Sequence, residues 1–287
     1  MKVWVNGSIC DAASACVSVL DHGLLYGDGV FEGLRVREGR VFALDRHMKR
    51  LGIGLKALSL NANVTHLREV VLSTARAYAE RNAYLRLIVT RGPGPLGVDP
   101  TTCENPTILC IAASLTIHPT EKLDVGLDLV TASMRRPAAD VLDPRVKSLN
   151  YLNNAMAKLE ACQRGADEAL LLNSQGHVAE ASVTNVFVVR DGWLLTPPAS
   201  DGALEGITRE AVIRLARDLD VVAREKTLTR FDLLGADEVF LTGTGAGLVP
   251  VRSLDKRPIG RQVPGPLFER FAAAYRELTA TDGVPLA

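Results

Sequence analysis

A lysine, a tyrosine and a glutamate, carried by two short runs of the sequence, most constrain what this chain can fold into. Lys147 and Tyr151 lie four residues apart at the start of a predicted helix, and Glu180 follows a predicted hairpin turn between two apolar strands. If the amine, the phenol and the carboxylate act on one ligand, a helix start and a strand end must meet. The pattern therefore predicts a fold that mixes helices with strands.

The composition limits the class of protein. With 287 residues, of which 47% are hydrophobic, the chain can bury the cores of two ordinary domains. Basic and acidic residues number 33 each, so the net charge gives no reason to expect nucleic acid or an anionic membrane as a partner. The first residues are too polar for a signal peptide, and no apolar run reaches the roughly 20 residues of a membrane helix.

The five cysteines and five histidines are scattered, and no CxxC spacing occurs. We therefore expect no disulfide framework and no metal site. The expected location is a reducing cytoplasm.

Hydrophobic periodicity and turn residues divide the chain into strands and helices. In the first part the predicted strands cover residues 2–9, 18–20, 34–37, 41–43, 84–90 and 107–114, and the predicted helices cover 45–58 and 65–82. In the second part the predicted strands cover 124–133, 168–173, 186–189, 193–196 and 238–242, and the predicted helices cover 149–163, 208–219 and 266–278. These elements predict two α+β domains, residues 1–116 and 125–287, joined by a connector at 117–124.

The chemistry of the first three residues suits pyridoxal phosphate. A lysine forms a Schiff base only as the neutral amine, and the positive end of a helix dipole disfavours the ammonium form of Lys147. A phenol such as that of Tyr151 can bond the ring oxygen, and a carboxylate such as Glu180 can keep the pyridine nitrogen protonated. The ordinary alternatives are a solvated surface lysine and a strand-end carboxylate.

Three further features could bind anions. The run 206–209 opens a predicted helix, whose free N–H groups and Thr208 hydroxyl suit a phosphate. The glycine-rich turn 241–247 ends a strand, and its N–H groups could hold a phosphate or a carboxylate. Arg46 begins the first helix and could clamp a phosphate as a fork donor. The alternatives are a simple N-cap, an ordinary turn and a solvated arginine.

Tyr84 and Arg86 lie two residues apart on a predicted strand, so both side chains point to one face. An arginine on an otherwise apolar strand needs a carboxylate partner, either within the protein or on a substrate. The following segment, residues 91–100, is rich in glycine and proline and must be a loop.

Taken together, these residues give the chain a family resemblance. It resembles the fold-type IV pyridoxal phosphate enzymes, the class IV aminotransferases, and among them most closely the branched-chain amino acid aminotransferases. The resemblance extends over nearly the whole chain, through residues 26–33, 46–47, 147–161, 180–187 and 206–250. It implies the two-domain fold of the D-amino acid aminotransferase-like enzymes, with a small N-terminal α/β domain and a larger, barrel-like C-terminal α/β domain.

The resemblance also implies residue roles. Lys147 would form the Schiff base and shuttle the proton, Tyr151 would bond the phenolic oxygen of the cofactor, and Glu180 would pair with its pyridine nitrogen. The phosphate would be held by Arg46, Ile207, Thr208 and Thr244, with Asn185 close by. The N–H groups of Thr244 and Gly245 would bind the substrate α-carboxylate. The substrate wall would comprise Phe31, Gly33, Tyr84 and Arg86, with Tyr26 and Val98 contributed across a dimer interface.

Some residues depart from the family pattern. Gly245-Ala246-Gly247 stands where Ala-Ala-Glu is usual, which bears on substrate preference. The loop at 93–98 lacks the Arg-x-His carboxylate trap of D-amino acid aminotransferases. The resemblance therefore implies a homo-oligomeric transaminase that exchanges the amino group between L-branched-chain amino acids and 2-oxoglutarate, with amino acids and 2-oxo acids as its small-molecule partners.

Other functions stay open on sequence grounds. A transaminase of D-amino acids or R-amines would keep the same cofactor residues, and aminodeoxychorismate lyases share the lysine and the glutamate. A binding protein on the same fold without cofactor chemistry would not need Lys147, Tyr151 and Glu180 together.

Overall fold

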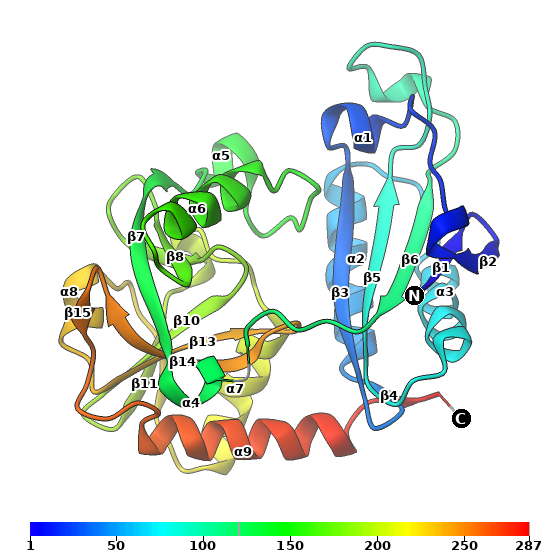
Figure 1. Cartoon of the computed structure of the whole chain (residues 1–287). Helices are drawn as coiled ribbons and strands as arrows, with labels where there is room; N and C mark the ends of the chain where they lie inside the picture. Colours follow the sequence, from blue (N-terminus) through cyan, green and yellow to red (C-terminus); the bar gives the residue numbers. More distant parts are fainter. Residues whose placement is uncertain (120, 287) are drawn as a thin grey trace. The chain divides into compact units, whose positions relative to one another are not determined.

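The structure, a computed structural model, describes residues 1–119 and 121–286 and divides the chain into two compact units. Unit 1 comprises Met1–Leu115, Val146–Asn150 and the chain from Thr279 onward, and unit 2 comprises Thr116–Arg145 and Tyr151–Leu278. Figure 1 shows the course of the chain, coloured from blue to red. Thr120, within the predicted connector 117–124, lies outside the described residues, and Glu121–Val125 form helix α4.

Unit 1 is built on a seven-stranded antiparallel sheet in the order β16-β4-β3-β5-β6-β1-β2. Its strands are β1 (Lys2–Val5), β2 (Ser8–Asp11), β3 (Gly29–Arg37), β4 (Arg40–Val41), β5 (Ala83–Thr90), β6 (Ile108–Ala113) and β16 (Val284–Pro285). Side chains alternate along β5, so one face is apolar and buried while the other carries Tyr84 and Arg86.

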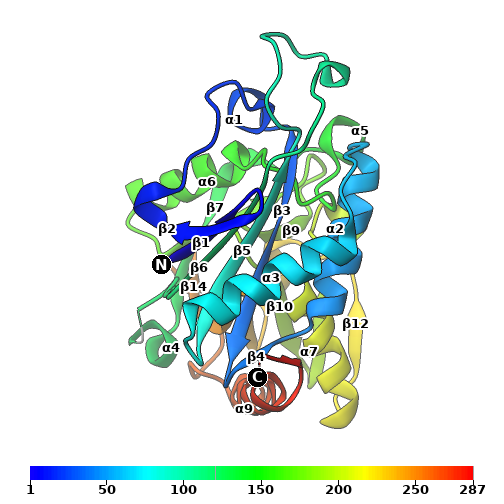
Figure 2. The same ribbon diagram turned by 90° about the vertical axis from the view of Figure 1, so that its right-hand side faces the viewer.

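Two helices cover the apolar face of this sheet, α2 (Leu44–Ala57) on β3 and α3 (Val64–Tyr78) on β1 and β6 (Figure 2). The core between them contains Leu34, Leu67 and Leu85, all fully buried. The Asn63 side chain caps α3 by accepting from the N–H groups of Thr65 and His66. Both helices were predicted from their apolar periodicity.

The predicted strand at 18–20 is wrong. These residues are coil and turn, and they lead into a short helix, α1 (His22–Tyr26). The Asp21 side chain accepts from Gly23 N–H at 2.7 Å, and Gly27 ends α1 with a φ of 70° in the left-handed region. Strand β3 then begins at Gly29, five residues earlier than predicted. Two 3-10 turns, Ala12–Ser14 and Pro100–Thr102, complete this part of the chain.

Two segments expected in the C-terminal domain belong to unit 1. Val146–Asn150 runs beside β3, where Phe31 N–H donates to Lys147 O at 3.0 Å and Leu149 N–H donates to Gly29 O at 2.9 Å. Near the other end of the chain, Val284 pairs with Val41 and adds β16 to the sheet. Main-chain hydrogen bonds join Val146–Asn150 to β3 and Val284 to β4. These partners are far apart in sequence, so hydrophobic periodicity does not reveal the pairing.

Unit 2 is built on a nine-stranded mixed sheet in the order β12-β11-β10-β13-β14-β7-β8-β9, with β15 paired to β14. Its strands are β7 (Leu127–Arg135), β8 (Glu168–Leu172), β9 (Val178–Ala181), β10 (Asn185–Arg190), β11 (Trp193–Thr196), β12 (Ala223–Glu225), β13 (Glu238–Gly243), β14 (Gly247–Leu254) and β15 (Arg257–Pro258). A tight turn brings β9 back beside β10, where Ala181 N–H donates to Thr184 O. The sheet therefore curls toward closure, as the barrel-like prediction required.

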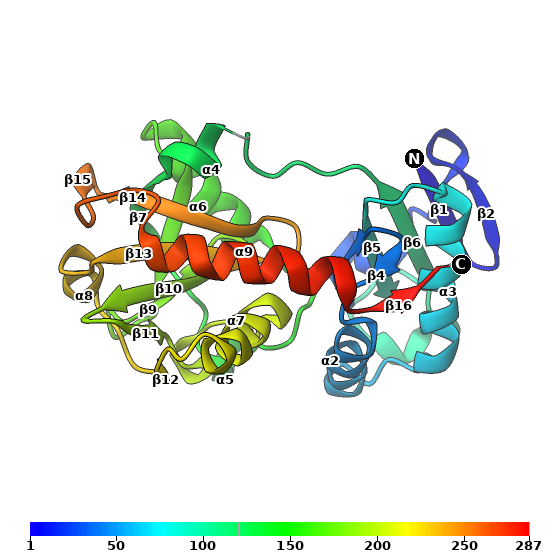
Figure 3. The same ribbon diagram turned by 90° about the horizontal axis from the view of Figure 1, so that it is seen from below.

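The helices of unit 2 pack on this sheet. They are α4 (Glu121–Val125), α5 (Ala139–Leu142), α6 (Leu152–Gln163), α7 (Ile207–Asp218), α8 (Arg230–Leu234) and the part of α9 (Pro266–Thr281) up to Leu278, with a 3-10 turn at Ala199–Asp201. Ala157 and Ala161 of α6 pack on β7 and β8. Phe268 of α9 stacks edge-on against Phe240 of β13, and α9 runs beside α7 (Figure 3).

In the part of the chain that the structure describes, no helix is long and apolar enough to span a membrane. The same residues contain no cluster of histidine, cysteine or acidic side chains that could hold a metal ion.

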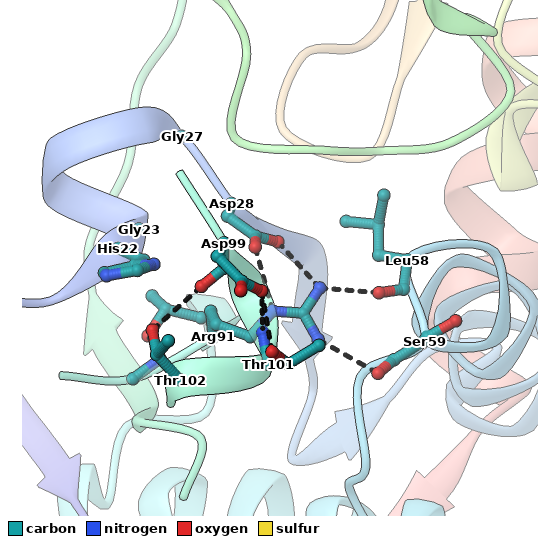
Figure 4. A network of polar contacts seen from close by, with 12 residues as sticks. His22, Gly23, Gly27, Asp28, Leu58, Ser59, Arg91, Asp99, Thr101 and Thr102 are labelled. Atoms are coloured by element: carbon teal, nitrogen blue, oxygen red, sulfur yellow. Dashed lines mark hydrogen bonds and ion pairs between the residues drawn. The ribbon is translucent and has the colours of Figure 1, made fainter. Parts of the chain in front are cut away.

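The loop after β5 is held at its base by Arg91 (Figure 4). The guanidinium group binds both carboxylate oxygens of Asp28, at 2.8 and 3.1 Å, and also the carbonyl oxygens of Leu58 and Ser59. Farther along, the Asp99 side chain accepts from Thr101 N–H and closes a turn. The glycine- and proline-rich segment is therefore a loop, as predicted, with an ordered base.

Replacing Arg91 with methionine should lower the free energy of unfolding by roughly 2–3 kcal/mol, because it leaves the half-buried Asp28 carboxylate unpaired. Urea unfolding measures this loss. Arg81→Met is the matched control: Arg81 pairs with Glu38 at the exposed surface, and its loss should cost about 1 kcal/mol or less. Equal effects of the two substitutions would contradict the structural role of Arg91.

Candidate active site

Lys147 lies in the extended segment beside β3, with Nζ 4.2 Å from the centre of the Phe31 ring. The predicted position at a helix start is wrong, because α6 begins at Leu152, and Tyr151 is its N-cap residue. Lys147 therefore lies outside α6 and does not occupy its first turn. Its ammonium group instead faces an aromatic ring, and the ring orients the lysine side chain.

The predicted substrate wall forms one surface of unit 1. Gly33 of β3 pairs with Arg86 of β5, and Phe31 and Tyr84 lie on the same face. The Arg86 guanidinium carbon is 4.8 Å from the Phe31 ring centre and 5.9 Å from that of Tyr84. A Cβ on Gly33 would lie 2.1 Å from the Tyr84 hydroxyl oxygen, so this position excludes any larger residue while Tyr84 keeps its place.

Arg86 is exposed, and its Nη2 lies 3.5 Å from the Tyr84 hydroxyl. Among the described residues, no carboxylate lies within ion-pair distance of Arg86. The sequence left open whether its partner is internal or a substrate. The aromatic contacts hold the guanidinium group in place and leave its charge without an acid partner in the described chain.

Tyr26 contacts the loop residue that precedes Val98. The Tyr26 hydroxyl accepts from Gly97 N–H at 2.8 Å, and the His22 ring packs edge-on against Tyr26. Val98, the next residue, is 80% exposed. The α1 helix thus supports the tip of the loop, and an apolar side chain projects from it. Their expected contribution across a dimer interface stays a prediction.

A buried ionic cluster of Glu32, His47 and Arg50 was missed by the sequence reasoning. Arg50 binds both Glu32 oxygens at 2.7 Å, and His47 Nδ1 lies 2.7 Å from Glu32 Oε2. Burial alone would raise the pKa of Glu32, but Arg50 and His47 outweigh it and bring that pKa to about 2. The only sequence signal was an acid inside an apolar strand, with a histidine and an arginine three residues apart on the next helix.

His47 is fully buried, and burial lowers its pKa despite the attraction of Glu32. The positive charge of Lys147 lowers it further. At neutral pH the ring is therefore uncharged. Its Nε2 has no hydrogen-bond partner among the described residues.

Arg46 lies in the first turn of α2 and is half-buried rather than solvated. Arg50 follows four residues later, so the two side chains project from the same side of the helix. Arg50 is committed to Glu32 by two charge-assisted bonds. The phosphate role predicted for Arg46 stays a prediction.

In unit 2, Glu180 is a buried carboxylate with several donors, and the residue is 5% exposed. Arg136 Nη2 lies 2.6 Å from Oε1 of Glu180, and Leu204 N–H donates to Oε2 at 3.0 Å. Asn185 Nδ2 lies 3.3 Å from the same Oε2. The predicted hairpin before Glu180 is confirmed as the β8–β9 turn, where Asn173 N–H donates to His177 O. The carboxylate is therefore fixed in direction.

Arg136 and Asn154 are further members of this network that the sequence did not reveal. Arg136 donates to Asn154 Oδ1 at 2.8 Å and to Gly202 O at 3.3 Å, and Asn154 donates to Ser182 O at 2.6 Å. Arg136 stands next to Arg135 in the sequence, and two adjacent arginines look like a solvated surface pair. In the structure Arg135 is exposed and Arg136 is buried.

The N-terminus of α7 adjoins this network. Gly206 is the N-cap residue, and a Cβ there would lie 2.0 Å from Asn185 Oδ1, so glycine permits the close approach. Ile207 and Thr208 form the first turn and are buried. The Thr208 hydroxyl lies 3.3 Å from the Tyr275 hydroxyl and therefore already has a partner. The first-turn N–H groups remain suited to an anion.

The glycine-rich turn is the β13–β14 hairpin, as predicted. Gly243 pairs with Gly247 across it, and Thr244, Gly245 and Ala246 form its three-residue tip. Gly247 has a φ of 72°, in the left-handed region that favours glycine. Strand β13 also pairs with β10, which places Asn185 opposite Thr242. Glu180, Asn185, the start of α7 and this hairpin are thus brought together in unit 2.

Replacing Arg136 with methionine should lower the free energy of unfolding by about 3–5 kcal/mol, because Glu180 would be left as a buried, unpaired carboxylate. Urea unfolding measures the change. Adding Glu180→Gln to Arg136→Met should recover part of the loss, since no buried charge then remains. The control is Arg135→Met, at the exposed neighbour, which should cost less than about 1 kcal/mol. A small loss in Arg136→Met would show that the ion pair is not important for stability.

A known family and its members match this chain along most of its length. The family model for amino-transferase class IV matches residues 29–254. Over 286 residues the chain is 44% identical to a protein of Methanocaldococcus jannaschii named "Putative branched-chain-amino-acid aminotransferase", covering 99% of this chain and 98% of that relative.

Solved structures agree with the sequence relatives. The branched-chain amino acid aminotransferase of Escherichia coli superposes with a TM-score of 0.94 at 33% identity, covering 98% of this chain and 95% of that one. The T.th. branched-chain amino acid aminotransferase, solved with pyridoxamine 5'-phosphate, gives a TM-score of 0.92 at 38% identity and covers 98% and 95%. The same enzyme is known in complexes with N-(5'-phosphopyridoxyl)-L-glutamate and with 4-methylvaleric acid.

Proposed function

Because the chain belongs to the class IV aminotransferases, we propose that it transfers the amino group between an L-branched-chain amino acid and 2-oxoglutarate, with pyridoxal phosphate as cofactor. The observation that carries this proposal is similarity along the whole chain to branched-chain enzymes, one of which binds both a glutamate adduct of the cofactor and a branched aliphatic acid. The substrate wall of unit 1 supports it, because it combines an apolar ring with a cation.

The residues of unit 2 fit the cofactor. A buried carboxylate, Glu180, is paired with Arg136 and is suited to a protonated ring nitrogen. The glycine cap at Gly206 opens α7 toward Asn185, and two buried hydroxyls nearby, on Thr184 and Thr242, lack partners among the described residues. This donor set has the charge and the hydrogen-bonding capacity that a phosphorylated pyridine requires.

When bound, pyridoxal phosphate supplies an electron sink for the bond broken at the substrate Cα. In the proposal, Lys147 would hold the cofactor through Nζ until the substrate amine displaces it, and the released amine would then take the proton from the substrate Cα. Tyr151 would donate its phenolic hydrogen to the ring oxygen, and Glu180 would hold the proton on the ring nitrogen. The N–H groups of the hairpin tip, at Thr244 and Gly245, orient the α-carboxylate of the substrate.

The wall residues would distinguish the two kinds of substrate. The ring of Phe31 would pack against an aliphatic side chain of the substrate, and burial of that side chain is worth about 0.8 kcal/mol for each CH₂. Arg86 would bind the distal carboxylate of 2-oxoglutarate or glutamate. Its position beside two rings, without an acid partner in the described chain, supports this role.

Transamination of D-amino acids or R-amines is the second candidate function. Its support is that such enzymes would keep the same cofactor residues; Gly247, where the family has an acid, would widen the substrate site and admit aromatic or sulfur-containing donors as well. The loop residues 93–98 lack the carboxylate trap of the D-specific enzymes, which favours the L-branched-chain assignment.

We further propose that the active species is at least a homodimer and that it works in the cytoplasm. The loop tip supports the first proposal, because Leu96 and Val98 are 76% and 80% exposed and apolar, which suits contact with a second copy. An active species with the mass of one chain would reject it.

Lys147→Ala should abolish transamination while the protein stays folded, because no other amine replaces Lys147. Rates would be measured with L-leucine, L-isoleucine, L-valine, L-methionine, D-alanine and R-1-phenylethylamine as donors, each with 2-oxoglutarate. The wild-type protein should prefer the L-aliphatic donors. If D-alanine or the R-amine exceeds all of them, the second candidate function replaces the first. Retention of more than roughly 5% of wild-type turnover by Lys147→Ala would reject the role of Lys147.

Arg86→Leu should raise KM for 2-oxoglutarate far more than KM for L-leucine, because only the former has a distal carboxylate. Steady-state kinetics with each substrate varied in turn measures the two effects. Arg86→Lys keeps the charge without the fork and should recover part of the loss. Equal losses for both substrates would assign Arg86 a structural role.

Arg46→Ala should weaken cofactor affinity by about 1.5–3 kcal/mol, and added cofactor should restore activity. Arg50→Ala is the comparison, because its guanidinium is bound to Glu32 and its loss should mainly lower stability. Cofactor titration of both variants decides between them. If Arg50→Ala loses the affinity and Arg46→Ala does not, the phosphate contact belongs to Arg50.

A further inference from the structure

The side chain of Thr242 is 1% exposed, yet its hydroxyl has no hydrogen-bond partner among the described residues. Buried hydroxyl groups in folded proteins are normally paired with protein, with water or with a ligand. Thr196 shows the ordinary case on a nearby strand: it is equally buried, and its hydroxyl donates to Val186 O at 2.7 Å. Thr242 therefore needs an explanation that its own chain does not supply.

The position of Thr242 indicates what its hydroxyl faces. Thr242 of β13 is paired directly with Asn185 of β10. Side chains of directly opposed residues in an antiparallel pair lie on the same face of the sheet, with their Cβ atoms about 5 Å apart. Asn185 reaches Leu204 O with its nitrogen, and its oxygen lies against Gly206. Thr242 thus shares a face with the residue that contacts the start of α7.

The start of α7 has backbone N–H groups suited to an anion, and its N-cap residue offers them no side-chain acceptor. The helix is 12 residues long, and its N-cap residue, Gly206, has no side chain to satisfy the first N–H groups. The hydroxyl expected to assist there, that of Thr208, lies 3.3 Å from the Tyr275 hydroxyl. The unpaired Thr242 hydroxyl, on β13, therefore lies on the same side as the N-terminus of α7.

We propose that the Thr242 hydroxyl is a ligand of the cofactor phosphate bound at the N-terminus of α7. The inference rests on the proposed function, since it concerns the phosphate of that cofactor. Thr184 has the second unpaired hydroxyl of this region, but its methyl group is directed at Gly243, where a Cβ would lie 3.0 Å away. Thr184 therefore serves as a comparison and not as the proposed ligand.

The test uses the full chain freed of cofactor, with substitutions of Thr242 and matched controls. Thr242→Val removes the hydroxyl at nearly constant shape, and Thr242→Ser keeps it. Thr196→Val removes a buried hydroxyl that has an internal partner, and Thr184→Val removes the other unpaired one. For each protein the dissociation constants of pyridoxal phosphate and of pyridoxal are measured by titration, and the thermal midpoint is measured without ligand.

Thr242→Val should bind pyridoxal phosphate roughly 10- to 100-fold more weakly, as expected for a lost hydrogen bond to a charged group. Its affinity for pyridoxal, which has no phosphate, should not change. Without ligand its thermal midpoint should stay the same or rise, because an unpaired hydroxyl is replaced by a methyl group. Thr242→Ser should keep the wild-type affinity. Thr196→Val should melt at a lower temperature and bind the cofactor normally.

Three results would overturn the inference. Equal losses of affinity for pyridoxal phosphate and pyridoxal would show that Thr242 acts on the ring. Unchanged affinity, or a loss in Thr184→Val alone, would remove Thr242 from the phosphate site. A lower thermal midpoint of unliganded Thr242→Val would reveal an internal partner. Failure of the wild-type protein to bind pyridoxal phosphate would reject the proposed function. If the wild-type protein binds it, the results for the variants test the role of Thr242 alone.

Discussion

The main-chain pairing of Val146–Asn150 with β3 is the constraint on which the arrangement of unit 1 depends. Two hydrogen bonds, from Phe31 N–H to Lys147 O and from Leu149 N–H to Gly29 O, fix the lysine beside the ring of Phe31. The same strand supplies Gly33 to the predicted substrate wall and Glu32 to the buried cluster on its other face. Because side chains alternate along a strand, β3 directs Phe31 and Gly33 to one face and Glu32 to the other. One strand thus positions the lysine, the wall and the ionic support together.

Each unit contains one buried carboxylate that is held by an arginine. Glu32 is held by Arg50 and lies within the core of unit 1, while Glu180 is held by Arg136 beside the start of α7. A buried ion pair contributes little net stability, but removal of one partner is costly. Such pairs therefore fix the direction of a carboxylate more than they strengthen the fold. For Glu180 the fixed direction is what its proposed role at the ring nitrogen of the cofactor would require.

Most of the fold could be predicted from the sequence, since the helices α2, α3, α7 and α9 and most long strands follow from apolar periodicity and turn residues. The α+β class and the family also followed from the ordered residues around Lys147 and Glu180. What could not be predicted depends on distant pairing: the strand-like course of Lys147, the return of residues 284–285 to β4, and the burial of Arg136 beside an exposed Arg135. Residues 18–20, predicted as a strand, are coil and turn, and the capping by Asp21 and the left-handed cap at Gly27 delimit the unpredicted helix α1 at His22–Tyr26.

The return of the chain end to unit 1 has a consequence for how the protein is made. Arg40 donates to Gly283 O and Arg76 donates to Leu286 O, so contacts of unit 1 join residues separated by 243 and 210 positions. During vectorial synthesis the first 115 residues leave the ribosome long before their last strand exists. The edge of β4 is then an unpaired strand edge, open to pairing with other chains until β16 arrives. Residues 1–115 of unit 1 can thus complete their sheet only after residues 284–285 have been synthesised.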